Sequence, residues 1–91
     1  MAQAVPQQTE QTQQPKTVEI SVNRRQVTVS GPRQTGLGIK QAALDQGVPI
    51  EVGFQLSEQL GPHQTRIVGD TDEVAVHKGS VFFAVAGDDN S

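Results

Sequence analysis

The feature that most constrains the fold is a strict alternation of apolar and polar residues near the start of the chain. Val18, Ile20 and Val22 are separated by polar residues, and the same period of two returns at Val27 and Val29. This period places the apolar side chains on one face of an extended strand. The intervening stretch "NRR" lacks the Asn-Gly pair typical of tight hairpins, but it is short and polar enough for a turn. The pattern therefore predicts a β-hairpin with one apolar face.

A single helix is predicted after the hairpin, within "GPRQTGLGIKQAALDQG". Thr35 can cap its first turn, and Gly47 suits the left-handed position after its last turn. Ile39, Ala42 and Ala43 share one face, where small alanines would let the helix lie close to a sheet. The two leucines of the segment fall on the opposite side. This imperfect pattern indicates either an irregular first turn or one exposed leucine.

Three further strands are expected in the second half of the chain. They are a strand over Phe54–Leu56, a short strand around Ile67, and the terminal run "VFFAV". We interpret "DTDEVAVHKGS" as a turn-rich connection that directs Val74 and Val76 inward. The last run is apolar at successive positions, which is typical of a central strand. The predicted order is therefore strand, strand, helix, strand, strand, strand.

The last strand presents two alternating sets of side chains. The bulkier set comprises Val81, Phe83 and Val85. We expect it to pack against the helix, which would leave Phe82, Ala84 and Ala86 facing outward as a surface for a partner protein. The alternative is that Phe82 is half-covered by Ile67 or by a connecting loop.

Length and composition limit the possible organisation and partners. The 91 residues suffice for one small domain. Residues 1–15 hold six glutamines and two prolines without apolar periodicity, so we expect a disordered leader there. A net charge of −3 and an aromatic set of only three phenylalanines argue against nucleic-acid binding.

The absence of cysteine excludes disulfides, thiolate zinc sites and a thiol nucleophile. Small secreted domains often depend on disulfides, so a cysteine-free composition favours the cytoplasm. The chain has no apolar run of 18 residues and no signal-peptide pattern, so we expect neither a membrane span nor secretion.

Two short motifs share part of their pattern with known ligand sites. "GPRQTG" has the glycine spacing of a phosphate loop, but Leu37 and Gly38 stand where lysine and Ser/Thr are required. Asp70, Asp72 and Glu73 could suggest a calcium loop, yet the twelve-residue pattern is absent. A turn before a helix and a solvated turn are the better interpretations. We expect no metal site and no cofactor.

The remaining titratable groups do not form a catalytic set. His63 and His77 have no serine or cysteine constellation between them and are expected at the surface. Lys16, Lys40 and Lys78 are expected to be solvated, and any of them could accept an isopeptide bond. Without a nucleophile–base pair, an enzyme is not expected.

The order of elements resembles the β-grasp fold of ubiquitin-like proteins, from Thr17 to Gly87. The opening hairpin "VEISVNRRQVTVS", the helix "TGLGIKQAALDQG" and the turn "HKGS" before the final strand carry the similarity. "TGLGIKQAA", "GDTDEVAV" and "VFFAV" look most like bacterial multi-ubiquitin domains. The resemblance implies an α+β fold with one helix across one face of a mixed four- to five-stranded sheet. It places the domain at residues 16–87.

The resemblance also implies a function as a conjugated protein modifier. By position, Gly87 corresponds to the glycine that such modifiers attach to a target amine. A short C-terminal tail would then be removed, comprising Asp88, Asp89, Asn90 and Ser91. The implied partners are a processing peptidase, an activating enzyme that adenylates the glycine and passes it to a cysteine, and a conjugating enzyme. A glycine leaves its carbonyl accessible from both sides, whereas the two aspartates would obstruct it.

The chain departs from the familiar modifier in one respect. That family ends in Gly-Gly after a flexible basic stretch, whereas here Ala86–Gly87 directly follows the last strand. Pairing through Val85 would leave two residues, about 7 Å, to project. Three alternatives stay open: a β-grasp sulfur carrier, a ubiquitin-like interaction domain that is never conjugated, and Gly87 as a plain strand terminator.

Overall fold

The computed structural model describes residues 16–87, and within this range it contains one helix and seven strands. The predicted leader, residues 1–15, and the predicted tail, residues 88–91, lie outside the described residues. In chain order the elements are β1 (Lys16–Val22), β2 (Arg25–Gly31), β3 (Arg33–Thr35), α2 (Gly36–Asp45), β4 (Gln55–Gly61), β5 (Gln64–Val68), β6 (Glu73–Ala75) and β7 (Val81–Val85).

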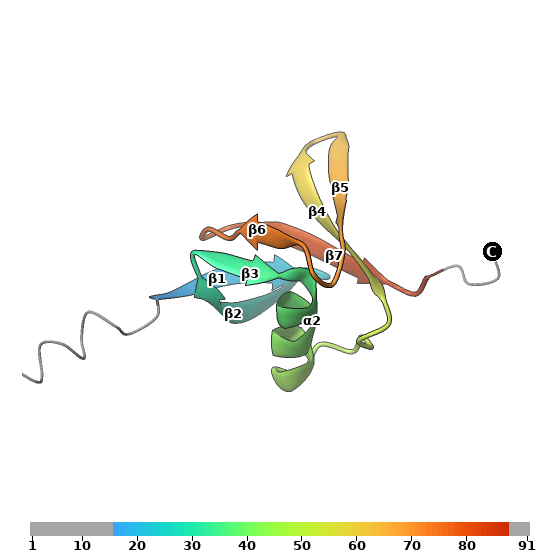
Figure 1. Cartoon of the computed structure of the whole chain (residues 1–91), viewed down its shortest axis with the longest axis horizontal. Coiled ribbons are helices and arrows are strands. Elements are labelled where there is room, and N and C mark those ends of the chain that lie inside the picture. Colours follow the sequence, from blue (N-terminus) through green and yellow to red (C-terminus); the bar gives the residue numbers. More distant parts are fainter. Residues whose placement is uncertain (1–15, 88–91) are drawn as a thin grey trace, which may run out of the picture.

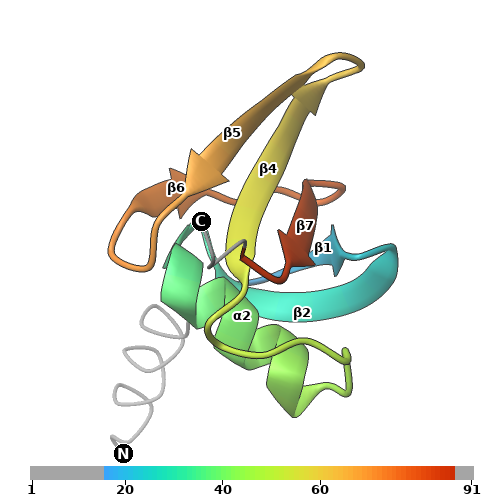
Figure 2. The same ribbon diagram turned by 90° about the vertical axis from the view of Figure 1, so that its right-hand side faces the viewer.

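The main sheet has five strands in the order β2-β1-β7-β4-β5. β1 and β7 run parallel, and the other neighbouring pairs are antiparallel. α2 lies across one face of this sheet, and the β4–β5 hairpin projects beyond it (Figures 1 and 2). β3 and β6 form a separate two-stranded pair. The mixed five-stranded sheet with one helix confirms the expected α+β architecture and is consistent with a β-grasp.

The predicted opening hairpin is confirmed, with Ile20 opposite Val27 in its register. Its turn is formed by Asn23 and Arg24, whose φ angles are 54° and 68°. Two successive positive φ angles match the right-handed twist of the flanking strands, as in a type I′ turn. Asparagine tolerates this conformation well, so the hairpin forms without the glycine that usually follows.

The predicted helix is confirmed at both ends. The Thr35 hydroxyl accepts a hydrogen bond from the Gly38 N–H at 3.0 Å, and Gly47 has φ +94°. Ile39 and Ala43 are fully buried, whereas Leu44 is 37% exposed. The imperfect amphipathic pattern is therefore explained by one leucine at the surface.

The turn between β5 and β6 holds the first residues of the helix. The Gly36 N–H donates to the Asp72 carbonyl, and the Leu37 N–H donates to the Asp70 carbonyl, each at 3.1 Å. These bonds satisfy two of the N–H groups that a helix start leaves open. A Cβ on Gly36 would collide with the Gly69 carbonyl oxygen. Glycine is thus required by this close backbone approach.

The core lies between α2 and the sheet and includes the buried side chains of Ile20, Val22, Val27, Val29, Ile39, Ala43, Val48, Ile50, Leu56, Val68, Val74, Val76, Phe82 and Ala84. Val74 and Val76 point inward as predicted. The segment around them is not only a connection, because Glu73–Ala75 forms β6 and pairs with β3. The strand expected at Phe54–Leu56 is longer, at Gln55–Gly61, because it forms a hairpin with β5.

The predicted orientation of the last strand is wrong. Phe82 and Ala84 are 0% and 2% exposed and face the core, whereas Val85 is 56% exposed. The register explains this, because Phe82 lies beside Val22 of β1, and Ala84 lies opposite Leu56 of β4. Both neighbours are core residues, so the phase of β7 follows from its neighbours and not from the bulk of its own side chains.

Candidate functional site

The carboxyl end of β7 is the position at which the family resemblance predicts a functional glycine. β7 is a central strand between β1 and β4, and its last paired residue is Val85, opposite Gln55. Ala86 and Gly87 follow as exposed residues, and a Cβ built on Gly87 would have no heavy atom within 4 Å. At strand spacing, two residues span about 7 Å. The proposed tail, Asp88, Asp89, Asn90 and Ser91, lies outside the described residues.

A side chain from the first hairpin holds β7 just before this end. Asn23 Nδ2 donates to the Ala84 carbonyl at 3.0 Å, and the Ala84 N–H donates to Asn23 Oδ1 at 2.8 Å. The Asn23 backbone N–H also donates to the Phe82 carbonyl at 3.0 Å. From the sequence, Asn23 is expected only as part of a turn. Its contact with Ala84 joins residues 61 positions apart, which no local pattern indicates.

The outer face of the sheet differs from the predicted partner surface. Of the residues predicted there, Phe82 and Ala84 are buried and only Ala86 is exposed. In their place the outer face carries half-buried Phe83 with exposed Val85 and Ile67, and we name these three residues the outer patch. Phe83 and Ile67 both lie opposite Ser57 in the β7–β4–β5 ladder, so a small side chain separates them. The helix covers the other face of the sheet (Figure 2).

One of the three lysines that were expected to be solvated is buried instead. The Lys40 side chain is only 4% exposed and forms an ion pair with Asp70 at 2.8 Å. Its Nζ also donates to the carbonyls of Val52 and Phe54, each at 2.7 Å. Position 40 lies four residues after buried Gly36 and three before buried Ala43, which puts it on the packing side of α2. That spacing was the sequence signal for burial.

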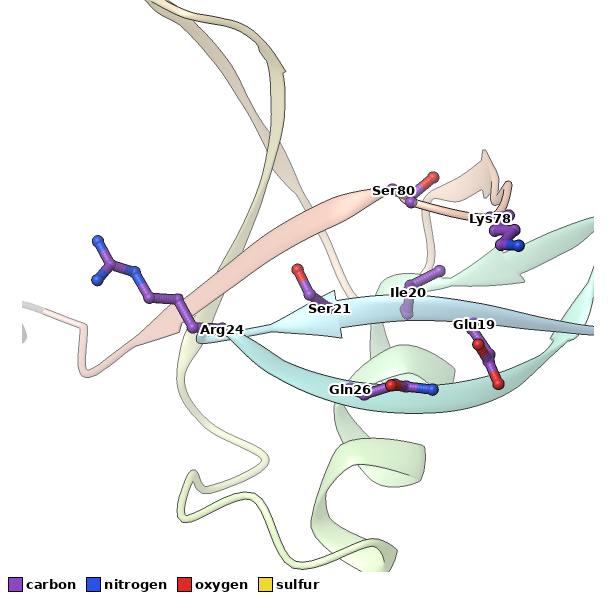
Figure 3. A pocket seen from close by; sticks show the side chains of 8 residues that line it. Glu19, Ile20, Ser21, Arg24, Gln26, Lys78 and Ser80 are labelled. Carbon is purple, nitrogen blue, oxygen red and sulfur yellow. The ribbon is translucent and has the colours of Figure 1, made fainter.

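The other two lysines, Lys16 and Lys78, are exposed as predicted, as are His63 and His77. Lys78 lines a shallow hollow of about 330 Å³ near the start of β7, together with Glu19, Ile20, Ser21, Arg24, Gln26, Gly79 and Ser80. Figure 3 shows Arg24 pointing away from Lys78 and Glu19, so the charges do not converge. The Ser80 hydroxyl accepts from the His77 backbone N–H at 3.0 Å, an interaction that belongs to the turn.

The acidic residues weighed as a calcium loop have other partners. Asp70 pairs with Lys40, and Glu73 pairs with Arg33 at 3.2 Å. Asp72 Oδ2 accepts from the Gly69 N–H at 2.8 Å and so closes the β5–β6 turn. Across residues 16–87, no three His, Cys, Asp or Glu side chains are grouped to hold a metal ion.

The mixed five-stranded sheet with one helix across one face is the architecture of a ubiquitin-like β-grasp domain. The family model for multiubiquitin matches residues 18–88, and the chain belongs to that family. Neither the curated proteins nor the solved structures provide a match. In the described part of the chain, no helix has the length and apolar character needed to cross a membrane.

Proposed function

We propose that this protein is a ubiquitin-like modifier that is processed after Gly87 and attached through the Gly87 carboxyl to an amine of a target protein. The observation that carries this proposal is the isolation of Gly87. It is exposed, lacks neighbours within 4 Å of a Cβ position, and follows a central strand that fixes its location. Membership of the multiubiquitin family adds support, because it makes the domain ubiquitin-like.

The proposed chemistry requires no catalytic side chain from this protein. A peptidase would hydrolyse the Gly87–Asp88 bond and leave a carboxylate. An activating enzyme would join that carboxylate to AMP from ATP and release pyrophosphate. An enzyme thiol would then displace AMP to form a thioester, and a target amine would displace the thiol to form an amide. In the adenylation step the Gly87 carboxylate oxygen attacks the α-phosphorus of ATP. The hydrolysis and the two later displacements occur at the Gly87 carbonyl carbon, which a glycine leaves unhindered.

The short projection limits how these partners can bind. After processing at Gly87, only Ala86 and Gly87 would extend beyond the last paired residue of β7. An active site must therefore approach to within about 7 Å of the sheet. The outer patch lies on the face of the sheet that the helix does not cover. Exposed apolar side chains of this kind are common at contacts between proteins. The cysteine-free composition supports a cytoplasmic location for the pathway.

The proposal is tested by producing the chain with an activating enzyme, a conjugating enzyme and a peptidase from its own genomic neighbourhood, and recording intact mass. We expect loss of residues 88–91, followed by adducts through Gly87. Gly87→Ala should keep the fold and lower adduct formation at least tenfold, because a Cβ hinders each attack. Gly53→Ala is the matched control, since a Cβ there also meets no heavy atom within 4 Å. An intact terminus, or normal conjugation of the Gly87→Ala variant, would contradict the proposal.

A second candidate is an interaction domain that binds partners through the outer patch without being conjugated. The exposed fractions of Ile67 and Val85, 64% and 56%, favour it. In that case the mass of the chain would stay unchanged in the co-production experiment, while Ile67→Ser and Val85→Ser would weaken partner binding. A mass gain matching the exchange of one oxygen for sulfur would instead indicate a sulfur carrier.

A further inference from the structure

The Asn23 side chain makes the hydrogen bonds to β7 that a further residue of β1 would otherwise make. The β1–β7 pairing comprises only Ser21 with Val81 and Val22 with Phe82, after which β1 turns away into the hairpin. β4 continues to pair with β7 on the other side as far as Val85. Figure 3 shows the turn at Arg24 lying beside β7. The Asn23 amide extends the ladder on this open side by one residue, because it both donates to and accepts from Ala84.

Several features of Asn23 suit it to this role. Its positive φ of 54° belongs to the hairpin turn, and its side chain is partly buried between the turn and β7. The two bonds, at 3.0 Å and 2.8 Å, satisfy one backbone carbonyl and one backbone N–H of the same residue. An amide side chain can do this because it carries a donor and an acceptor in one plane.

We propose that Asn23 is a positioning residue for Gly87. By bonding Ala84, Asn23 fixes the point at which β7 ends and the projecting segment Ala86–Gly87 begins. The inference rests on the proposed function, because only a reacting Gly87 needs a defined position. With the Asn23 bridge at Ala84 on one side of β7 and the β4 pairing through Val85 on the other, the free segment before the cleavage site is limited to Ala86 and Gly87. A fixed short projection presents one peptide bond to a peptidase and one carboxyl to an activating enzyme.

Removal of the side chain should loosen the end of β7. Ala84 would lose both bonds on the hairpin side, so the end of β7 would be held by β4 alone and would detach more readily from Val85 back to Ala84. The free segment before the cleavage site would grow from two residues to four, from about 7 Å to about 13 Å. Additional peptide bonds would then become accessible to cleavage. The expected signature is a loss of selectivity for the bond after Gly87, beyond any loss of stability.

The chain offers a matched control in Gln46. Its side-chain amide makes the same two-bond bridge with Thr28 of β2, donating from Nε2 at 2.7 Å and accepting at Oε1 at 2.9 Å. β2 is an edge of the sheet and is separated from β7 by β1. Gln46→Ala therefore removes an equivalent bridge at a site that does not contact Ala84. Asn23→Gly removes the Asn23 bridge and keeps a residue that readily adopts the positive φ.

The first measurement is hydrogen exchange of the full chain, combined with digestion by a broad-specificity carboxypeptidase and intact-mass detection. For Asn23→Gly we expect about tenfold faster exchange of the Ala84 amide than in the unaltered protein, since a hydrogen bond is lost. We also expect trimming to proceed past Val85. The unaltered protein and Gln46→Ala should both resist trimming at Val85. Unchanged exchange and trimming in Asn23→Gly, or equal changes in Gln46→Ala, would overturn the proposal.

The second measurement uses the processing peptidase. The unaltered protein should give one product ending at Gly87, and Asn23→Gly should give further products ending before it. A single product from both proteins would overturn the positioning role. If the peptidase cleaves neither protein, the proposed function fails, and the exchange and trimming results still decide whether Asn23 fixes the strand end.

Discussion

Lys40 shows how one buried cation can organise a connection between two elements. Its three Nζ contacts tie α2 to the loop before β4, through Val52 and Phe54, and to the β5–β6 turn, through Asp70. An ammonium group has three donors, and each contact accounts for one of them. Because Asp70 is 53% exposed, water screens the ion pair, and the two carbonyl contacts carry much of the effect.

At this scale we expect Lys40→Met to lower the free energy of unfolding by about 2 kcal/mol, since methionine retains the bulk but leaves the carbonyls of Val52 and Phe54 without their donor. Lys78→Met, at an exposed turn, should change it by less than about 0.5 kcal/mol. Urea denaturation of both variants provides the measurement. Equal midpoints would show that the Lys40 contacts do not contribute to stability.

Gly36 provides a second prediction for a single residue. Gly36→Ala places a methyl group against the Gly69 carbonyl, a backbone atom that cannot rotate away. We expect a loss of about 2 kcal/mol, typical of overpacking. Gly53→Ala should be close to neutral because its Cβ would meet open space. Thermal melts of the pair test this, and a Gly36→Ala variant as stable as Gly53→Ala would refute the close approach.

Among the elements, β7 joins the two halves of the sheet and contains two adjacent phenylalanines in different environments. Phe82 is fully buried between α2 and the sheet, whereas Phe83 is half-buried on the outer face. Phe82→Ala should therefore cost about 3–5 kcal/mol, which is most of the stability of so small a domain. Phe83→Ala should cost about 1 kcal/mol or less and retain the fold. Circular dichroism during urea unfolding separates them, and the reverse order would contradict the register of β7.

The same strand shows what sequence reasoning could and could not predict. Alternation in residues 17–29 fixed the phase of the hairpin, because each apolar residue has a polar neighbour. "VFFAV" has no such alternation, so its phase depends on partners distant in the sequence, Val22 and Leu56. Short β6 was missed for the same reason, since its pairing with β3 is not local.

The candidate site was likewise only partly accessible from sequence. The location of Gly87 after the last strand follows from the chain order, whereas its exposure is a property of the folded chain and its role stays a prediction. The bridge from Asn23 to Ala84 depends on tertiary contact, so the residues near Ala84 gave no signal for it. Lys40 was expected at the surface because of its charge, and this prediction is wrong. Its helical spacing from Gly36 and Ala43 already indicated the packing side of α2.

For the whole molecule, we predict that residues 16–87 fold on their own. The core cluster extends from Ile20 to Ala84, and the glutamine-rich composition of residues 1–15 offers little apolar surface to add to it. A chain limited to residues 16–87 should therefore unfold within about 0.5 kcal/mol of the full chain in urea. A larger loss of stability would mean that the domain extends beyond these limits.

The direction of β7 has a further consequence for geometry. Lys78 precedes the strand and Gly87 follows it, so they lie at opposite ends, and Lys16 begins β1, which runs parallel to β7 (Figure 1). Five strand residues span about 17 Å, more than twice the length of a two-residue projection. If Gly87 is attached as we propose, a molecule therefore cannot join its own Gly87 carboxyl to Lys16 or Lys78. Copies joined through these lysines would form open chains in which every unit has the same orientation. Each unit would add its length along the strand axis.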